Sequence, residues 1–417
     1  MSIRSVAVIA LGMSAPSLAG PLTPALGPPG PANATIERIE PRTPITGPAP
    51  IVIDQPGSYY LIANIETTTS GIEIHATNVT LDLNGFTVRG DGEGAANDRG
   101  ICLLTQDTTG HVVIRNGFVD RFTHDGVSDT TDDQPQLTVE DVHVTRCRYG
   151  FYLFTPTTLR RCSAAESRFD GVRTFSPATI QGCVAGDNER DGFSVRDAAL
   201  SACVARANGR RGFAVAGKVT MQQCGAFENA SVGIAESPVF PNTAGVTISH
   251  SVAANNGGGG IGLGPGSVVT ACAAIGNQNG GIRAGFGSVI TACTARGNQT
   301  SNGITVASDS LVTDCVATEN VGEGFLIGDD SRIVGCVANG NGLAGFPIAG
   351  IRAGRRCVID SNNATGNPVG IDAAEDTIII RNTLGMNTLN LDAPNAKAGP
   401  LATDPATETS PWANFAF

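Results

Sequence analysis

The sequence predicts an all-β protein: a right-handed, single-stranded parallel β-helix, a solenoid with three short strands in each circuit of the chain. We call each circuit, of about 21 residues, a rung. Three observations predict this fold. Cysteines recur at a nearly constant interval, alanine and asparagine follow most of them at fixed distances, and glycine is abundant, at 53 of 417 residues. Self-similarity at a fixed period of this length is the signature of a solenoid.

The regular repeat extends over residues 162–346. Eight cysteines mark it at intervals of 20 to 22 residues, with one interval of 48 that Ser251 divides into 27 and 21. Alanine stands two residues after each mark, and asparagine stands five residues after each mark except Cys162, where the residue is Ser167. The cysteines are Cys162, Cys183, Cys203, Cys224, Cys272, Cys293, Cys315 and Cys336, and the asparagines are Asn188, Asn208, Asn229, Asn256, Asn277, Asn298, Asn320 and Asn341.

Each rung contains three short apolar patches separated by residues typical of turns. The Cys-x-Ala patch places both side chains on one face of a strand, as does the Phe193-x-Val195 patch, and a leading residue such as Ile180 marks the third strand. Three patches in about 21 residues leave no room for a helix of ten or more residues. Equivalent strands should therefore stack about 4.8 Å apart from rung to rung.

Stacking turns the repeated residues into ladders. We expect the asparagines to occupy left-handed turns and to share side-chain amide hydrogen bonds between rungs. We expect the ladder cysteines to be buried, reduced apolar fillers, since parallel Cβ vectors about 4.8 Å apart exceed the ~3.8 Å typical of a disulfide. Three cysteines lie outside this register, and their pairing is left open: Cys102, Cys147 and Cys357.

The first 50 residues differ from the rest of the chain. Residues 1–19 have the pattern of a signal peptide, with Arg4, a short apolar core and the small-residue cleavage site Ser17-Leu18-Ala19. Residues 20–50 are rich in proline, which predicts an extended arm. The sequence therefore predicts an exported protein, secreted, periplasmic or on the cell surface.

The remaining chain divides into one long domain and a tail. We expect a β-helix domain over residues 51–393, with irregular rungs in 51–161, regular rungs in 162–346 and the last rungs in 347–393. Residues 394–417 are expected to cap the last rung, because an uncovered strand edge invites pairing with other chains.

Composition excludes several classes of function. The net charge is −11, and Lys218 and Lys397 are the only lysines, so nucleic acid is not an expected partner. No apolar run reaches the ~18 residues that a membrane-spanning helix needs.

Three segments near the start of the domain carry a family resemblance: Pro56–Leu61, Gly71–Ile74 and Val79–Phe86. They resemble secreted bacterial right-handed β-helix repeat proteins of the pectate-lyase-like superfamily, and the resemblance covers nearly the whole mature chain. It implies a polysaccharide partner, because relatives include uronate-polysaccharide lyases, galacturonan hydrolases and mannuronan epimerases, beside a copper-delivery protein. The epimerase motif Asp-Pro-His-Asp is absent; Thr123-His124-Asp125 echoes only part of it.

Candidate site residues gather between residues 86 and 146, where the rungs are loose and carry polar insertions. Residues 162–336 have nearly minimal rungs, so we expect no cleft there. Proton abstraction beside a uronate carboxylate needs a base and a neutralising cation. The candidates are Asp120, Arg121, His124 and Asp125 for catalysis, Arg115, His143 and Arg146 for substrate binding, and Asp129, Asp132 and Asp133 for Ca²⁺, the only candidate cofactor.

Two hypotheses follow from these features. The first is a non-catalytic exported β-helix that binds carbohydrate or serves as a structural solenoid at the cell surface. The alternative is a polysaccharide lyase or epimerase that acts on an acidic, uronate-containing glycan, with or without Ca²⁺. An ordinary solvated loop also carries Asp and Thr, so composition alone does not choose between them.

Overall fold

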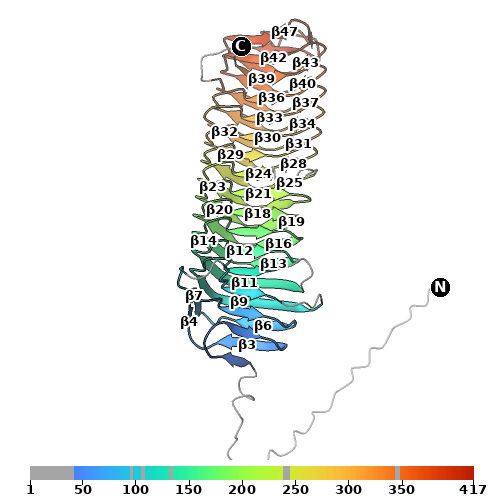
Figure 1. The fold of residues 1–417 in the computed structure, drawn as a ribbon. Helices are drawn as coiled ribbons and strands as arrows, with labels where there is room; N and C mark the ends of the chain where they lie inside the picture. Colours follow the sequence, from blue (N-terminus) through green and yellow to red (C-terminus); the bar gives the residue numbers. More distant parts are fainter. Residues whose placement is uncertain (1–41, 94–96, 105–108, 131–134, 238–244, 343–347) are drawn as a thin grey trace, which may run out of the picture. The chain divides into compact units, whose positions relative to one another are not determined.

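A computed structural model describes residues 42–93, 97–104, 109–130, 135–237, 245–342 and 348–417. The predicted signal peptide, most of the proline-rich arm, Asp132 and Asp133 lie outside these residues. The described residues form strands, turns and bends, and none of them forms a helix that could cross a membrane. The paired strands are parallel, each pair between neighbouring rungs or within the last one, so the described residues from Arg42 onward form a stacked parallel β-helix (Figure 1).

Sixteen strands, one from each rung, form a single parallel sheet, which we call the sixteen-strand sheet. Its strands are β2 (Ile51–Ile53), β5 (Ile72–Ile74), β8 (Ile101–Leu103), β10 (Val127–Asp129), β12 (Phe151–Leu153), β15 (Val172–Thr174), β18 (Phe193–Arg196), β21 (Phe213–Ala216), β24 (Ile234–Glu236), β27 (Ile261–Gly262), β30 (Ile282–Ala284), β33 (Ile304–Val306), β36 (Phe325–Ile327), β39 (Ala349–Ala353), β42 (Val369–Ala373) and β45 (Leu389–Asp392).

The other 32 strands form a second sheet with two arms. The first arm holds β1 (Thr43–Ile45), β3 (Gly57–Leu61), β6 (Val79–Asp82), β9 (His111–Asp120), β11 (Gln136–Thr145), β13 (Thr157–Arg160), β16 (Ala178–Gln181), β19 (Ala198–Ser201), β22 (Thr220–Gln222), β25 (Thr247–Ser249), β28 (Val268–Thr270), β31 (Val289–Thr291), β34 (Leu311–Thr313), β37 (Arg332–Val334), β40 (Val358–Asp360), β43 (Ile378–Ile380) and β46 (Lys397–Ala398).

The second arm contains the Cys-x-Ala strands. It holds β4 (Ile65–Thr67), β7 (Thr87–Gly90), β14 (Ser163–Ala165), β17 (Val184–Gly186), β20 (Val204–Arg206), β23 (Gly225–Phe227), β26 (Val252–Ala254), β29 (Ala273–Ile275), β32 (Thr294–Arg296), β35 (Val316–Thr318), β38 (Val337–Asn339), β41 (Asn363–Thr365), β44 (Thr383–Gly385), β47 (Leu401–Ala402) and β48 (Asn414–Ala416). The long strands β9 and β11 pass from the first arm to the second and join the two arms into one sheet.

Left-handed residues make the corners between strands. One stands directly before each ladder cysteine, as Ala202 before Cys203 does with a φ of 52°, and another stands directly before each ladder asparagine. The expectation that asparagine itself adopts the left-handed conformation is therefore wrong. The preceding residue bends the chain, for example Glu228 with a φ of 55°, and the asparagine side chain then points into the protein.

The asparagine column is a continuous hydrogen-bonded ladder. Asn256 donates Nδ2 to Oδ1 of Asn277 at 2.9 Å and to the carbonyl of Ala226 at 3.1 Å, and the Asn256 backbone N–H donates to the same Oδ1 at 3.1 Å. The same contacts recur from Asn188 to Asn367. Buried amides are stable here because each side-chain donor and acceptor has a partner on an adjacent rung.

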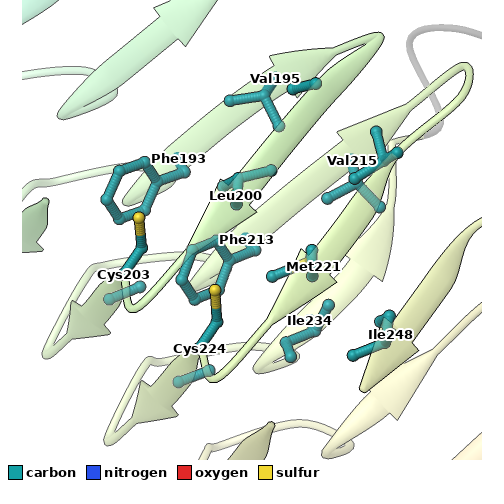
Figure 2. Packing of buried hydrophobic residues seen from close by; sticks show 14 of the residues in the cluster. Phe193, Val195, Leu200, Cys203, Phe213, Val215, Met221, Cys224, Ile234 and Ile248 are labelled. Carbon is teal, nitrogen blue, oxygen red and sulfur yellow. The ribbon is translucent and has the colours of Figure 1, made fainter. Parts of the chain in front are cut away.

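The cysteine column does more than fill space. The backbone N–H of Cys293 donates to Sγ of Cys315 at 3.4 Å, and the Cys293 thiol donates to the carbonyls of Val269 and Thr291. Towards the C-terminus asparagines replace the cysteines: Cys336 N–H donates to Oδ1 of Asn362 at 2.9 Å. Figure 2 shows how Cys203 and Cys224 repeat in the core beside the rings of Phe193 and Phe213, which stack at 4.9 Å.

All eleven cysteines are free and buried. The three cysteines outside the repeat register occupy three different places in the fold. Cys147 stands in the asparagine column, one rung before Ser167. Cys357 stands in a column with Ser331 and donates its N–H to Thr377 Oγ1 at 3.2 Å. Cys102 lies at the centre of β8, where its side chain is directed out of the core.

Both ends of the domain differ from the expected boundaries. The β-helix begins before Ile51. Strand β1 (Thr43–Ile45) lies in the stretch that the sequence assigned to the arm, and it pairs with β3 of the next rung. At the other end, β48 pairs with β44, and Asn414 Oδ1 accepts hydrogen bonds from Asn382. Residues of the predicted cap therefore complete the column in which Asn362, Asn382 and Asn414 continue the ladder cysteines.

Candidate functional site

The outer face of the sixteen-strand sheet carries the most chemically varied side chains of the described rungs. Side chains alternate along a strand, and in most of these short strands both residues that flank the middle one belong to the core, so the middle residue points outward. Strand register places these outward residues in one column: Glu73, Cys102, Ser128, Tyr152, Arg173, Ser194, Ala214, Ala235, Gly262, Arg283 and Thr305. The column changes from polar and aromatic to small and then to polar again.

A row of carboxylates lies beside the start of this column. Asp125, Asp170 and Asp191 each precede a glycine and a strand of the sheet, and all three are at most 3% exposed. Asp170 accepts a hydrogen bond from the Asp191 N–H at 3.2 Å. Asp191 receives a two-bond ion pair from Arg211, with Nε–Oδ1 at 3.1 Å and Nη2–Oδ2 at 2.9 Å.

Two of these carboxyl groups have perturbed acidity. Burial raises the pKa of Asp125, and the nearby His124 and Arg99 only partly oppose that effect. Burial and the neighbouring carboxylate of Asp191 raise the pKa of Asp170, although Arg173 opposes them. Each of the two carboxyl groups lies beside an arginine, with Asp125 Oδ2 3.9 Å from Arg99 Nε and Asp170 Oδ2 3.4 Å from Arg173 Nη1.

The imidazole of His124 lies between the carboxylate of Asp125 and the guanidinium of Arg148. Its Nδ1 is 2.7 Å from Oδ2 of Asp125, and Nη1 of Arg148 is 2.8 Å from its Nε2. A guanidinium can only donate, so Nε2 of His124 accepts and the imidazole is neutral in this arrangement. Both ring nitrogens are therefore occupied by protein groups.

Several buried polar atoms around His124 have no hydrogen-bond partner within the described residues. They are Asp98 Oδ2, Arg99 Nε, His124 Nδ1, Asp125 Oδ1 and Ser128 Oγ. The short His124–Asp125 contact thus places the neutral ring beside a carboxylate without hydrogen-bond geometry. Unsatisfied buried groups are rare in folded proteins, and such a cluster indicates a site at which water or a ligand supplies partners.

An aromatic patch adjoins this cluster. The rings of Tyr149, Tyr152 and Phe169 lie 4.6 to 5.0 Å apart, and Phe154 stacks on Phe175 with ring centroids 4.4 Å apart and planes at 7°. Tyr152 joins the two groups at 5.2 Å from Phe154 and 5.3 Å from Phe175. Five half-buried or nearly buried rings on an outer face are notable in a chain with only 5% aromatic residues.

Arginines alternate with these rings. Arg190 lies over Phe169 at 4.0 Å from the ring centroid, Arg148 over the same ring at 5.1 Å, and Arg173 over Phe175 at 5.0 Å. Cation–π contacts of this kind fix the orientation of a guanidinium without neutralising it. Within the part of the chain that the structure describes, neither Arg148 nor Arg190 makes an ion pair with a carboxylate.

The structure divides the predicted catalytic segment between two places. Asp120 receives hydrogen bonds from Arg89, Thr145 and Arg146 at a corner of the second sheet, away from the cluster that contains His124 and Asp125. Burial alone would raise the pKa of Asp120, but those hydrogen bonds outweigh it and hold the pKa below its usual value. Arg121 is exposed at a left-handed corner, with a φ of 61°.

The predicted substrate-binding residues are also separated. Arg146 is part of the Asp120 cluster. Arg115 pairs with Asp82, at 3.1 Å. His143 stacks on Phe118 and shares a hydrogen bond of 2.8 Å with Ser163.

The acidic loop gives no calcium site in the described residues. Asp129 is buried and accepts hydrogen bonds from Phe154 N–H, Thr155 N–H and Thr155 Oγ1, so its carboxylate holds the backbone of the next rung. Its predicted partners Asp132 and Asp133 are outside the described residues. Among the residues that can be placed, no three His, Cys, Asp or Glu side chains are arranged to hold a metal ion.

Sequence reasoning missed most of the aromatic patch and the carboxylate row. One signal was present: the tripeptides Asp125-Gly126-Val127, Asp170-Gly171-Val172 and Asp191-Gly192-Phe193 repeat at one position of the rung. The expectation that residues 162–336 lack a cleft is wrong. A groove of about 680 Å³ lies on the outer face over β24, β27, β30 and β33. It is open over Gly262, which has no side chain to fill it.

Comparison with known proteins gives the handedness of the helix. The family model described as "Right handed beta helix region" matches residues 239–384. No curated protein matches the chain.

Three solved structures illustrate the similarity. The A-module of Azotobacter vinelandii mannuronan C-5 epimerase AlgE4 is 15% identical over 83% of this chain and 91% of its own, with a TM-score of 0.39. Tailspike protein 3 of bacteriophage CBA120 is 14% identical over 85% of this chain and 59% of its own, at a TM-score of 0.33. Pectate lyase Pel9A is 18% identical over 82% of this chain and 74% of its own, at a TM-score of 0.26.

Proposed function

We propose that this right-handed parallel β-helix protein is exported and binds an acidic polysaccharide, without catalysis, on the outer face of the sixteen-strand sheet. The observation that carries the proposal is the patch of Tyr149, Tyr152, Phe154, Phe169 and Phe175, with arginines interleaved between the rings. The polysaccharide is the partner, and no cofactor is needed for this role.

The chemistry of the patch suits a uronate-containing glycan. Aromatic faces offer large apolar contact area at a low entropic cost, which matches the C–H face of a sugar ring. A guanidinium binds a carboxylate through two parallel hydrogen bonds. Arg148 and Arg190 are held in place by the rings, and neither makes an ion pair with a described carboxylate, so the patch offers two guanidinium groups in a protein of net charge −11.

The same geometry disfavours acid–base catalysis at His124 as the side chain now lies. Nε2 is occupied by Arg148 and Nδ1 faces Asp125, so neither nitrogen is free to take a proton from a sugar. Asp125, Asp170 and Asp191 are too buried to reach a substrate. A lyase or epimerase remains the second candidate because of one observation, the contact of His124 with Asp125 on one side of its ring and with Arg148 on the other. A glycan carboxylate that drew Arg148 away would free Nε2 as a base.

Binding and turnover can be separated in one set of measurements. Alginate, pectate and a neutral glucan are tested by affinity electrophoresis and titration calorimetry, and ultraviolet absorbance reports unsaturated products. We expect binding of the anionic glycans without turnover, and at least a tenfold weaker Kd for Tyr152→Ala. Phe118→Ala is the control, because Phe118 is an exposed ring that lies outside the patch.

Three results would count against the binding proposal. Equal glycan affinity of Tyr152→Ala and wild type would show that the aromatic patch does not contact the glycan. Wild-type protein that retained none of the anionic glycans would refute the function itself. Product formation that His124→Ala abolishes would replace the proposal with the lyase or epimerase.

A further inference from the structure

The groove of about 680 Å³ lies over rungs where the sequence reads Gly257–Gly260, Gly262, Gly264 and Gly266. We call it the glycine groove. Gly262 occupies the outward floor position of β27, and Gly259 and Gly264 line the groove on its two sides. A Cβ on Gly262 would meet nothing closer than Val232 Cγ1 at 3.9 Å. The hollow at Gly262 therefore exists because a side chain is missing there, whereas at Gly264 the Glu236 carboxylate covers the floor and accepts the Gly264 N–H at 2.7 Å.

Two exposed side chains line the glycine groove without an internal role. Phe286 is 60% exposed, one of the most exposed large apolar residues of the described chain. Arg283 has no side-chain hydrogen bond or ion pair with any described residue. An exposed ring and an unpaired guanidinium over a shallow floor repeat the chemistry of the Tyr152 patch.

The glycine groove and the Tyr152 patch lie on one continuous track. Tyr152 and Arg283 belong to the same outward column, six strands apart in the sixteen-strand sheet. At about 4.8 Å per strand the two are separated by roughly 29 Å. The positions between them are Arg173, Ser194, Ala214, Ala235 and Gly262, so the side chains shrink toward the groove.

A second column runs along one edge of this track. Backbone hydrogen bonds link its members from rung to rung, and they are His124, Arg148, Phe169, Arg190, Arg210, Ser231, Gly258 and Asn279. This column leads from the unsatisfied cluster at His124 past the aromatic patch to Asn279, which lines the glycine groove. Its first five members carry basic or aromatic side chains, and its last three, Ser231, Gly258 and Asn279, are small.

We propose that the glycine groove is a second subsite for the same uronate polysaccharide, so that one glycan chain follows the outer face from the Tyr152 patch to Arg283 and Phe286. This inference rests on the proposed function. A peptide is a poorer occupant, because added strands need a free sheet edge and the groove lies on a sheet face whose strands are all paired. Linking two subsites on one ligand multiplies affinity without new contacts at either one.

The test uses uronate oligosaccharides of increasing length and the full chain. Calorimetry gives Kd for wild type, Tyr152→Ala, Phe286→Ala, Arg283→Ala and Gly262→Leu, which fills the hollow. We expect the wild-type Kd to fall at least tenfold once the oligosaccharide is long enough to span about 29 Å. The three groove variants should bind short oligosaccharides like wild type and lose that gain, whereas Tyr152→Ala should weaken binding at every length. Thermal midpoints show that each variant is folded.

The outcomes separate this inference from the function on which it rests. If groove variants bind long oligosaccharides as tightly as wild type, the second subsite is refuted and the patch stands. If wild-type Kd does not change with length, the continuous track is refuted. If the unliganded protein is a dimer that Phe286→Ala converts to a monomer, the groove is an interface between two copies and the inference fails. If wild type binds no uronate oligosaccharide of any length, both the proposed function and the second subsite are refuted.

Discussion

Asn188 donates its side-chain Nδ2 to Oδ1 of Asn208 at 2.9 Å, one rung away, and its backbone N–H donates to the same oxygen at 3.2 Å. This pair is the repeating unit of the asparagine ladder. Each asparagine side chain donates to the preceding rung and accepts hydrogen bonds from that rung's asparagine, so the ladder fixes the register of the rungs from Asn188 to Asn387. The outer face can vary in sequence because this inner column holds the fold.

Interrupting the ladder should destabilise the protein strongly. In Asn277→Ala, the N–H and Nδ2 of Asn256 lose their acceptor inside the protein. We expect the free energy of unfolding to fall by about 3 kcal/mol, measured from the urea midpoint. The control is Gln278→Ala. Gln278 is the next residue along the chain and its side chain is exposed, so this substitution should leave the urea midpoint unchanged. Equal midpoints for the two variants would contradict a structural role for the ladder.

The glycine that opens each strand of the sixteen-strand sheet should tolerate no side chain. A Cβ at Gly303 would lie 2.6 Å from Asn320 Nδ2 and 2.7 Å from the Gly324 carbonyl oxygen. Gly303→Ala should therefore cost about 3 kcal/mol of folding free energy through overpacking. Gly262→Ala is the matched control, since space is open there. A wild-type melting temperature for Gly303→Ala would show that neighbouring rungs move apart easily.

The buried thiols should be unreactive until the chain unfolds. Burial raises the pKa of Cys102 to about 11 and of Cys147 to about 12, so little thiolate exists at pH 8. Ellman's reagent should titrate almost none of the eleven thiols in native protein and all eleven in guanidinium chloride. Fewer than eleven reactive thiols after unfolding without reductant would reveal a disulfide.

Asp120 should contribute stability in a way that depends on pH. Its pKa is lower in the folded protein than the ordinary 3.8, so its contribution is present above pH 3.8 and is lost as the pH falls through the folded-state pKa. Asp120→Asn should cost about 2 kcal/mol at pH 7 and progressively less below pH 3.8, as followed by urea unfolding. Asp54→Asn, at an exposed carboxylate, should differ little from wild type at any pH. A deficit that stayed constant down to pH 2 would argue for lost packing instead of lost charge.

The candidate site could be predicted from the sequence only in part. His124 and Asp125 are close together because neighbours in sequence lie at the same corner. Arg148 reaches His124 because it occupies the next rung, 24 residues later. Asp120 was grouped with His124 on sequence proximity, yet the corner at Arg121 directs Asp120 to Arg89 and Arg146. In a solenoid, side-chain neighbours are one rung away, so proximity along the chain is a poor guide to a site.

The sequence by itself determined the period, the strands and the two ladders. Each of these depends on local spacing, which repeats about every 21 residues and leaves only one way to stack. Tertiary structure decided which residue of each corner is left-handed, how Tyr152 meets Phe175, and that a groove is open over Gly262 in the regular rungs. Those features depend on which side chains face one another across rungs and on what fills the space outside the sheet. Both are properties of the stacked coil, and a single repeat does not contain them.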